Sequence, residues 1–118
     1  MGNPVVHFES LGKDAAALQA FYTELFGWKV SADNPMNYGI VDTGVEGAIG
    51  GGIARSPDGG SVVTSYVGVD DPQAYLDKAE GLGGRAIMPV TEIPNMVTFA
   101  LLADPEGHVV GVVKSGSA

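Results

Sequence analysis

Hydrophobic and polar side chains change from a period of two to a helical period near the start of the chain. Residues 5–9 alternate between apolar and polar side chains, which predicts a β-strand. Residues 14–26 carry apolar side chains at i, i+3, i+4 and i+7, which predicts an amphipathic helix. Asp14 in its first turn and Gly27 just past its end suit the two helix termini. The predicted apolar stripe consists of Leu18, Phe21, Tyr22 and Leu25.

Three short apolar runs follow this helix, and they complete a pattern of strand, helix and three strands. These runs predict strands over residues 28–31, 38–42 and 48–54. A polar segment rich in turn-forming residues, about residues 55–61, then separates the first pattern from the rest of the chain.

The same order of elements recurs after this linker. Residues 62–69 predict a strand, and Asp71 is a good N-cap for a helix with Pro72 at its first position. That helix is expected over residues 72–82, with an apolar stripe of Tyr75, Leu76, Ala79 and Leu82 and with Gly83 and Gly84 at its end. Three more strands are expected over residues 85–90, 97–102 and 108–113, and residues 104–107 predict a hairpin turn.

A single offset relates the two patterns at the level of the sequence. The offset of 64 − 7 = 57 residues places His7 on Thr64 and also places Ala54 on Gly111. A period of this length is typical of two copies of one supersecondary unit, each too small to bury a core alone. We therefore predict an internal duplication.

Composition limits the classes of protein to which the chain can belong. Its 118 residues suit one domain, and the absence of cysteine excludes disulfides, thiolate metal ligands and a cysteine nucleophile. No apolar run approaches the roughly 20 residues that cross a bilayer, and the N-terminus lacks a basic and then apolar signal, so a cytoplasmic location is expected. A net charge of −8 argues against nucleic acid or an anionic membrane as partner.

Three motifs resemble those of the vicinal-oxygen-chelate superfamily, which includes glyoxalase I, bleomycin-resistance proteins and extradiol dioxygenases. They are FYTELFGW at residues 21–28, YVGVDD at 66–71 and DPEGH at 104–108. The resemblance covers nearly the whole chain. It implies an α+β fold in which two tandem βαβββ modules form one cup-shaped mixed sheet with the helices outside. It also implies one glyoxalase-like domain over residues 1–118, with module one at about 1–55 and module two at about 62–118, and a homodimer.

The resemblance also implies where a metal site would lie in this chain. Metal-dependent members carry ligands on the first and last strand of each module, and those positions here are His7, Ala54, Thr64 and Gly111. His7 is a good ligand, whereas Gly111 stands where metal-dependent members carry a glutamate. A metal centre of this kind needs at least three converging protein donors. We therefore expect neither a metal nor another cofactor, and we expect glyoxalase I and dioxygenase chemistry to be absent.

The candidate site lies where the resemblance places the inner face of the cup. His7 and Glu9 share one face of the first strand, and Thr64 and Tyr66 have matching parity on the second module's first strand. His7 suits a general base or a hydrogen-bond donor, although it could also be a purely structural histidine. The glycine-rich strand is expected to leave room for a ligand. The predicted ligand contacts are His7, Glu9, Gly52, Ala54, Thr64, Tyr66 and Gly111.

Three functional hypotheses remain open from the sequence. The first is a metal-independent protein of the glyoxalase/bleomycin-resistance type that binds a small organic molecule between its modules. The second is an enzyme, a lyase, isomerase or oxygenase, in which His7 is the catalytic acid/base. In a variant of this hypothesis, His7 is one ligand of a divalent metal that Glu9 or a second subunit completes. The third is a scaffold whose cup is filled with side chains.

Overall fold

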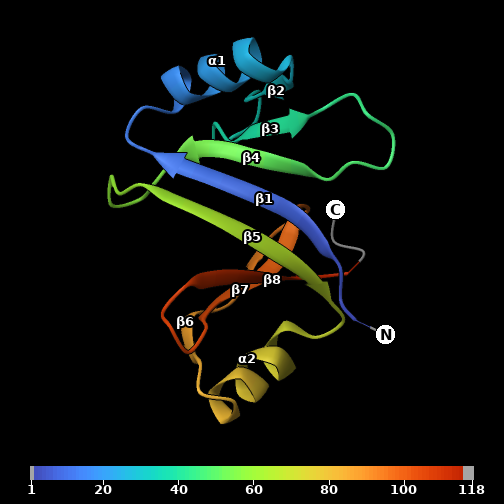
Figure 1. Cartoon of the computed structure of the whole chain (residues 1–118), viewed down its shortest axis with the longest axis vertical. Helices are drawn as coiled ribbons and strands as arrows, with labels where there is room; N and C mark the ends of the chain where they lie inside the picture. The colour runs from blue at the N-terminus through green and yellow to red at the C-terminus, as the bar shows by residue number, and fades with distance from the viewer. Residues whose placement is uncertain (1, 116–118) are drawn as a thin grey trace. The chain divides into compact units, whose positions relative to one another are not determined.

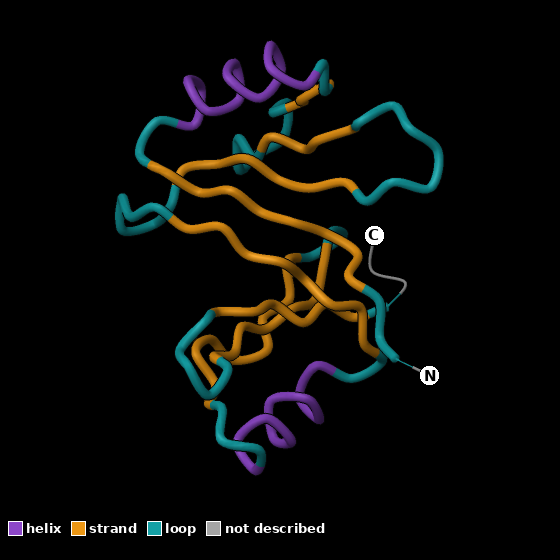
Figure 2. Tube along the Cα trace, in the orientation of Figure 1, coloured by secondary structure: helices purple, strands orange, loops and turns teal. Residues whose placement is uncertain are grey.

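The computed structural model describes residues 2–115, and its elements follow the predicted order twice (Figure 1). The α+β class and the two βαβββ modules are therefore confirmed, with strands and helices distributed along the trace as Figure 2 shows. The first module contains β1 (Val5–Gly12), α1 (Ala15–Phe26), β2 (Lys29–Ser31), β3 (Gly39–Asp42) and β4 (Gly50–Arg55). The second contains β5 (Val62–Val69), α2 (Pro72–Gly81), β6 (Arg85–Ile93), β7 (Val97–Ala103) and β8 (Val109–Lys114). In the described part of the chain, neither helix has the length and apolar character that spanning a membrane requires.

In the first module the strands are ordered β2-β3-β4-β1, and only β1 and β4 run parallel. The helix that connects β1 to β2 has well-formed ends. Asp14 lies outside the helix as its N-cap rather than in its first turn, because its carboxylate accepts a hydrogen bond of 3.0 Å from the Ala17 N–H. Gly27 ends α1 in the left-handed region, at φ 72°, as predicted.

The predicted apolar stripe of α1 is only partly in contact with the sheet. Phe21 and Leu25 are 57% and 56% exposed, so two of the four residues of the predicted stripe lie in solvent. The helix contacts the sheet at Gln19, whose side-chain amide donates a hydrogen bond of 2.8 Å to the Ile53 carbonyl of β4, and Tyr22 and Phe26 pack on Trp28 with ring centroids 5.7 and 5.0 Å apart. Trp28 in turn packs on Phe8 of β1, while Phe21, Leu25 and Phe26 remain more than half exposed.

In the second module the strands are ordered β5-β8-β7-β6, and its core is small and aliphatic. Asp71 is the N-cap of α2 with Pro72 at the helix start, as predicted. Leu82 is 70% exposed because it is the C-cap of a helix that ends at Gly81, so its predicted place in the apolar stripe is wrong. The core cluster consists of Val69, Leu76, Ala100 and Val112.

The first residues of the chain form a compact unit with the second module rather than with the first. One unit is His7–Thr64, and the other joins the residues up to Val6 to those from Ser65 onward. The Gly68 N–H donates a hydrogen bond of 2.8 Å to the Pro4 carbonyl, and Asn3 Nδ2 donates one of 3.0 Å to the Tyr75 hydroxyl. The first strand therefore contributes its N-terminal end to one unit and the rest of its length to the other.

The offset between the modules is not constant, which corrects one predicted correspondence. The first strands differ by 62 − 5 = 57 residues, whereas the last strands differ by 109 − 50 = 59. In register, Glu9 pairs with Gly52 and Tyr66 pairs with Gly111. Gly111 therefore corresponds to Gly52, and the prediction that it corresponds to Ala54 is wrong. The physical reason lies in β6, whose two register shifts against β7 take up extra residues in the second module.

Candidate functional site

Three half-buried side chains of the first module form one hydrogen-bonded group. The Tyr38 hydroxyl donates a hydrogen bond of 2.9 Å to Glu9 Oε2. The Tyr38 hydroxyl oxygen also lies 2.8 Å from His7 Nε2. The His7 and Tyr38 rings are nearly parallel, with an interplanar angle of 15° and centroids 6.3 Å apart. We call His7, Glu9 and Tyr38 the tyrosine-bridged group.

The sequence places these side chains together through one strand and one turn. His7 and Glu9 are two apart on β1 and share a face, while Phe8 between them packs on Trp28 on the α1 side. Tyr38 immediately precedes β3, where its backbone is held on both sides by Asn34. Asn34 Oδ1 accepts a hydrogen bond from the Tyr38 N–H (3.0 Å), and Asn34 Nδ2 donates one to the Tyr38 carbonyl (2.7 Å).

Tyr38 is the member of the tyrosine-bridged group that the sequence pattern did not reveal. The segment 38–42 predicts a strand, and Tyr38 reads there as its first residue. The available signal is the turn before it, since asparagine side chains favour local hydrogen bonds to the backbone and tolerate positive φ, as Asn37 does at 52°. That signal predicts a turn and gives no partner for the tyrosine hydroxyl.

A glycine on the neighbouring strand makes room for this tyrosine. Gly52 is buried on β4 and pairs in register with Glu9, so a side chain there would point to the same face. A Cβ atom on Gly52 would overlap the hydroxyl and ring of Tyr38. Tyr38 thus takes up the space that Gly52 was expected to leave for a ligand.

The hydrogen-bond directions fix where the His7 ring carries its proton. Because the single Tyr38 hydroxyl proton goes to Glu9, the contact with His7 requires Nε2–H to donate to the tyrosine oxygen. Burial lowers the pKa of His7 and outweighs the nearby Glu9 carboxylate, which raises it. The favoured form is therefore a neutral imidazole protonated on Nε2.

The lowered pKa of His7 predicts that stability falls under mildly acidic conditions. The unfolded chain has a histidine pKa of about 6.5, so below that pH it binds a proton that the folded chain resists. The free energy of unfolding should consequently decrease as the pH falls from about 6.5 through the lowered pKa, and His7→Asn should flatten this part of the curve. Denaturant unfolding between about pH 5 and 8 measures the slope. Equal slopes for wild type and His7→Asn, with His108→Asn as the control, would contradict the assignment.

The remaining predicted contacts lie on β4, β5 and β8. Ala54 is buried two residues beyond Gly52 on β4, beside Leu11 in register. Thr64 is a buried residue of β5. Tyr66 is buried with its ring over Gly111, where a Cβ atom would overlap it, and its ring meets Phe99 edge-on with centroids 6.2 Å apart. The structure therefore brings His7, Glu9 and Gly52 together, and it brings Tyr66 and Gly111 together.

The donor set does not fit a metal centre of the superfamily type. Among residues 2–115, no three His, Cys, Asp or Glu side chains gather where they could hold an ion. His7 and Glu9 both bond the Tyr38 hydroxyl, while Gly52 and Gly111 carry no donor and are overlain by tyrosine rings. Two donors fall short of the set that such a centre needs.

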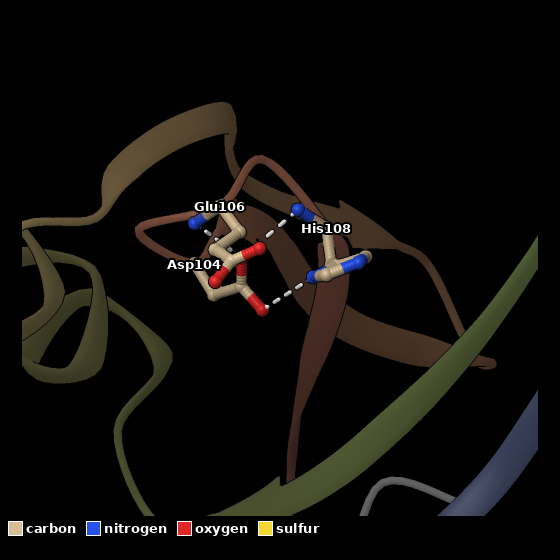
Figure 3. Close-up of polar contacts among 3 residues, drawn as sticks. All are labelled: Asp104, Glu106 and His108. Carbon is tan, nitrogen blue, oxygen red and sulfur yellow. Dashed lines mark hydrogen bonds and ion pairs between the residues drawn. The ribbon is translucent and has the colours of Figure 1, made fainter.

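The second histidine stabilises a turn. Asp104 Oδ1 accepts hydrogen bonds of 2.9 Å from the N–H groups of Glu106 and His108, and its Oδ2 lies 3.0 Å from His108 Nδ1 (Figure 3). These bonds, led by the one from the His108 backbone, lower the pKa of Asp104. The His108 side chain is 73% exposed.

Two βαβββ modules in tandem define the class of the protein. Residues 8–113 match the model of the glyoxalase-like domain. The chain therefore belongs to the glyoxalase-like domain family, within the vicinal-oxygen-chelate superfamily that its motifs predicted.

Curated relatives share the domain but are longer. The chain is 33% identical over 107 residues to CFP32 of Mycobacterium bovis, a protein provisionally named a glyoxylase, covering 84% of this chain and 41% of the relative. It is 28% identical over 126 residues to DnrV of Streptomyces peucetius, named an anthracycline biosynthesis protein, covering 92% of this chain and 46% of the relative. The chain thus spans less than half the length of the curated relatives it matches.

Solved structures show the same fold at low sequence identity. Methylmalonyl-CoA epimerase from Mycobacterium tuberculosis matches with a TM-score of 0.67 at 13% identity, over 93% of this chain and 86% of that one. A glyoxalase/bleomycin resistance protein/dioxygenase superfamily member from Vibrio splendidus 12B01 matches with a TM-score of 0.64 at 14% identity, over 97% and 100% of the two chains. At these identities the likeness concerns the fold alone.

Proposed function

We propose that the chain binds a small organic molecule on its first module, without a metal or other cofactor, through the tyrosine-bridged group. The observation that carries this proposal is the convergence of His7 and Glu9 on one hydroxyl oxygen, at 2.8 and 2.9 Å. A half-buried donor and acceptor whose positions are fixed by a strand supply the few oriented polar groups that a ligand site needs.

The names of related proteins support an organic ligand. DnrV is named for anthracycline biosynthesis, and structures of similar fold include methylmalonyl-CoA epimerase in complex with methylmalonyl-CoA. That Thr64, Tyr66, Ala54 and Gly111 also contact the ligand stays a prediction, as does the cytoplasmic location.

We also propose that the chain forms a homodimer. The exposed apolar side chains of α1 support this proposal, because Phe21, Leu25 and Phe26 are all more than half exposed on one helix.

An enzymatic function is the second candidate, and the neutral His7 favours it. A histidine whose pKa burial lowers, linked through Tyr38 to a carboxylate, is a suitable general base for removing a proton from an organic substrate. In this case His7 would be the catalytic acid/base, and the reaction would be an isomerase or lyase type of proton transfer.

Thermal unfolding with a ligand panel tests the binding proposal. The panel should contain polycyclic aromatic metabolites, acyl-CoA esters and bleomycin. A ligand present at 100 times its Kd stabilises the folded chain by about 2.7 kcal/mol. We expect at least one class to raise the Tm of wild type and of His108→Ala, and to do so much less for His7→Ala. An equal rise in all three proteins would show that the ligand binds elsewhere.

Two further measurements separate the alternatives. Stoichiometric divalent metal in protein purified without chelator, lost in His7→Ala, would contradict metal-independent binding. Exchange of a ligand C–H for deuterium in D2O, catalysed by wild type and abolished by His7→Ala, would favour the enzyme over the binding protein.

A further inference from the structure

The group that His7 and Glu9 hold in the structure indicates the chemistry that they recognise. His7 donates through Nε2–H to the Tyr38 oxygen, and that hydroxyl donates its own proton to Glu9. A donor and an acceptor placed about one oxygen atom form the complement of a hydroxyl group, which accepts one hydrogen bond and donates another. A carbonyl or an ether oxygen only accepts hydrogen bonds, so it matches the His7 donor but not the Glu9 acceptor.

The surroundings of the hydroxyl accommodate an aromatic ring as well. Gly52 presents no Cβ atom, and the Tyr38 ring lies where that atom would be. The ring is also nearly parallel to the His7 imidazole, at 15°. An aliphatic alcohol would satisfy the two polar groups and leave the flat space over Gly52 unfilled, whereas a phenol would fill both.

We propose that His7, Glu9 and Gly52 form a phenol-recognition site, that the Tyr38 side chain occupies it as an internal ligand, and that a phenolic small molecule replaces this side chain when it binds. The proposal rests on the proposed small-molecule function and assigns its ligand class. Because Asn34 holds only the backbone of Tyr38, rotation of the side chain empties the site without breaking that turn.

Competition with Tyr38 sets an expectation for affinity. A site that its own side chain fills most of the time binds an external ligand more weakly, in proportion to the fraction of molecules in which the site is open. Removing the Tyr38 ring should therefore strengthen the binding of a small phenol, provided that His7 and Glu9 stay in place on β1.

The test is binding of 4-methylphenol and of toluene to Tyr38→Ala, measured by NMR titration. The two probes differ by one hydroxyl, and a site built to hydrogen-bond that group discriminates strongly against the analogue that lacks it. We expect Tyr38→Ala to bind 4-methylphenol at least about tenfold more tightly than toluene, and at least about tenfold more tightly than wild type does. Glu9→Gln in the Tyr38→Ala background should reduce the preference over toluene.

Tyr22→Ala is the matched control, because it removes a tyrosine ring that packs on Trp28, away from His7 and Glu9. The proposal is overturned if Tyr38→Ala binds toluene as tightly as 4-methylphenol, or if Tyr22→Ala shows the same preference for the phenol. Tyr38→Leu, which keeps apolar volume, replaces Tyr38→Ala if the alanine variant does not fold. If the panel yields a His7-dependent ligand but the phenol preference is absent, the phenol class fails and the binding function stands. If no compound of the thermal-unfolding panel binds, the proposed small-molecule binding itself is contradicted.

Discussion

Replacing Gly52 by alanine is expected to expel the Tyr38 side chain and to destabilise the fold by about 1–3 kcal/mol. The added Cβ would overlap the Tyr38 hydroxyl and ring, and the β4 backbone that carries it is paired on both sides, with β1 and β3. The strand therefore cannot yield, and the tyrosine must leave its bonds with His7 and Glu9. Denaturant unfolding measures the loss of stability, and the ring signals of His7 and Tyr38 in NMR spectra report the displacement.

A glycine in open surroundings provides the control for this substitution. Apart from its chain neighbours and its own helix backbone, a Cβ atom on Gly81, in the last turn of α2, would meet no atom within 4 Å, so Gly81→Ala should be neutral or stabilise by up to about 1 kcal/mol. Gly52→Ala should cost little in a Tyr38→Ala background, because the overlapping ring is gone. An unchanged stability and unchanged His7 signals in Gly52→Ala alone would contradict the described packing.

Replacing Gly111 by alanine is expected to destabilise the second module at least as much as Gly52→Ala destabilises the first, by about 1–3 kcal/mol or more. Tyr66 is 8% exposed, and its ring lies directly over Gly111, where the new Cβ would overlap it. The Tyr66 ring packs edge-on against the ring of Phe99 on β7 of the same module. It has little room to move, so the strain falls on the β5–β8 pair.

A double-mutant cycle with Tyr66→Ala isolates this contact. Each single substitution should destabilise, and the double variant should be more stable than the sum predicts by at least about 1 kcal/mol, because Tyr66→Ala removes the overlap. Additive losses, measured by denaturant unfolding, would show that the ring of Tyr66 does not oppose a side chain at position 111.

Local sequence signals were sufficient to predict most of the elements. The strand Val62–Val69 and the Asp71 N-cap agree with the structure because alternation, capping and proline placement act over a few residues. The exposure of Phe21 and Leu25 was not predictable in this way, since it depends on how much of α1 the folded sheet covers. Periodicity predicts which side chains of a helix share an apolar face, but it does not predict how much of that face the sheet covers.

The candidate site was predicted only in part, for a related reason. His7 and Glu9 followed from strand parity, a property of neighbouring residues. Tyr38 lies 31 residues from His7 and 29 from Glu9, and its contact depends on the pairing of β4 with β1 and on the missing side chain of Gly52. The offset of 59 between the last strands escaped prediction similarly, because register shifts within β6 leave no clear mark in the sequence.

The sharing of β1 between the two compact units has a consequence for dissecting this protein into fragments. A cut in the linker at residues 55–61 separates the two sequence copies but leaves Pro4 and Val6 on the wrong side of the break. Their partner Gly68 would then lose the carbonyl that accepts its N–H and the valine side chain beside it. The two halves of the sequence thus do not coincide with the two compact units, and a fragment meant to represent the second unit would need residues 2–6 grafted onto it.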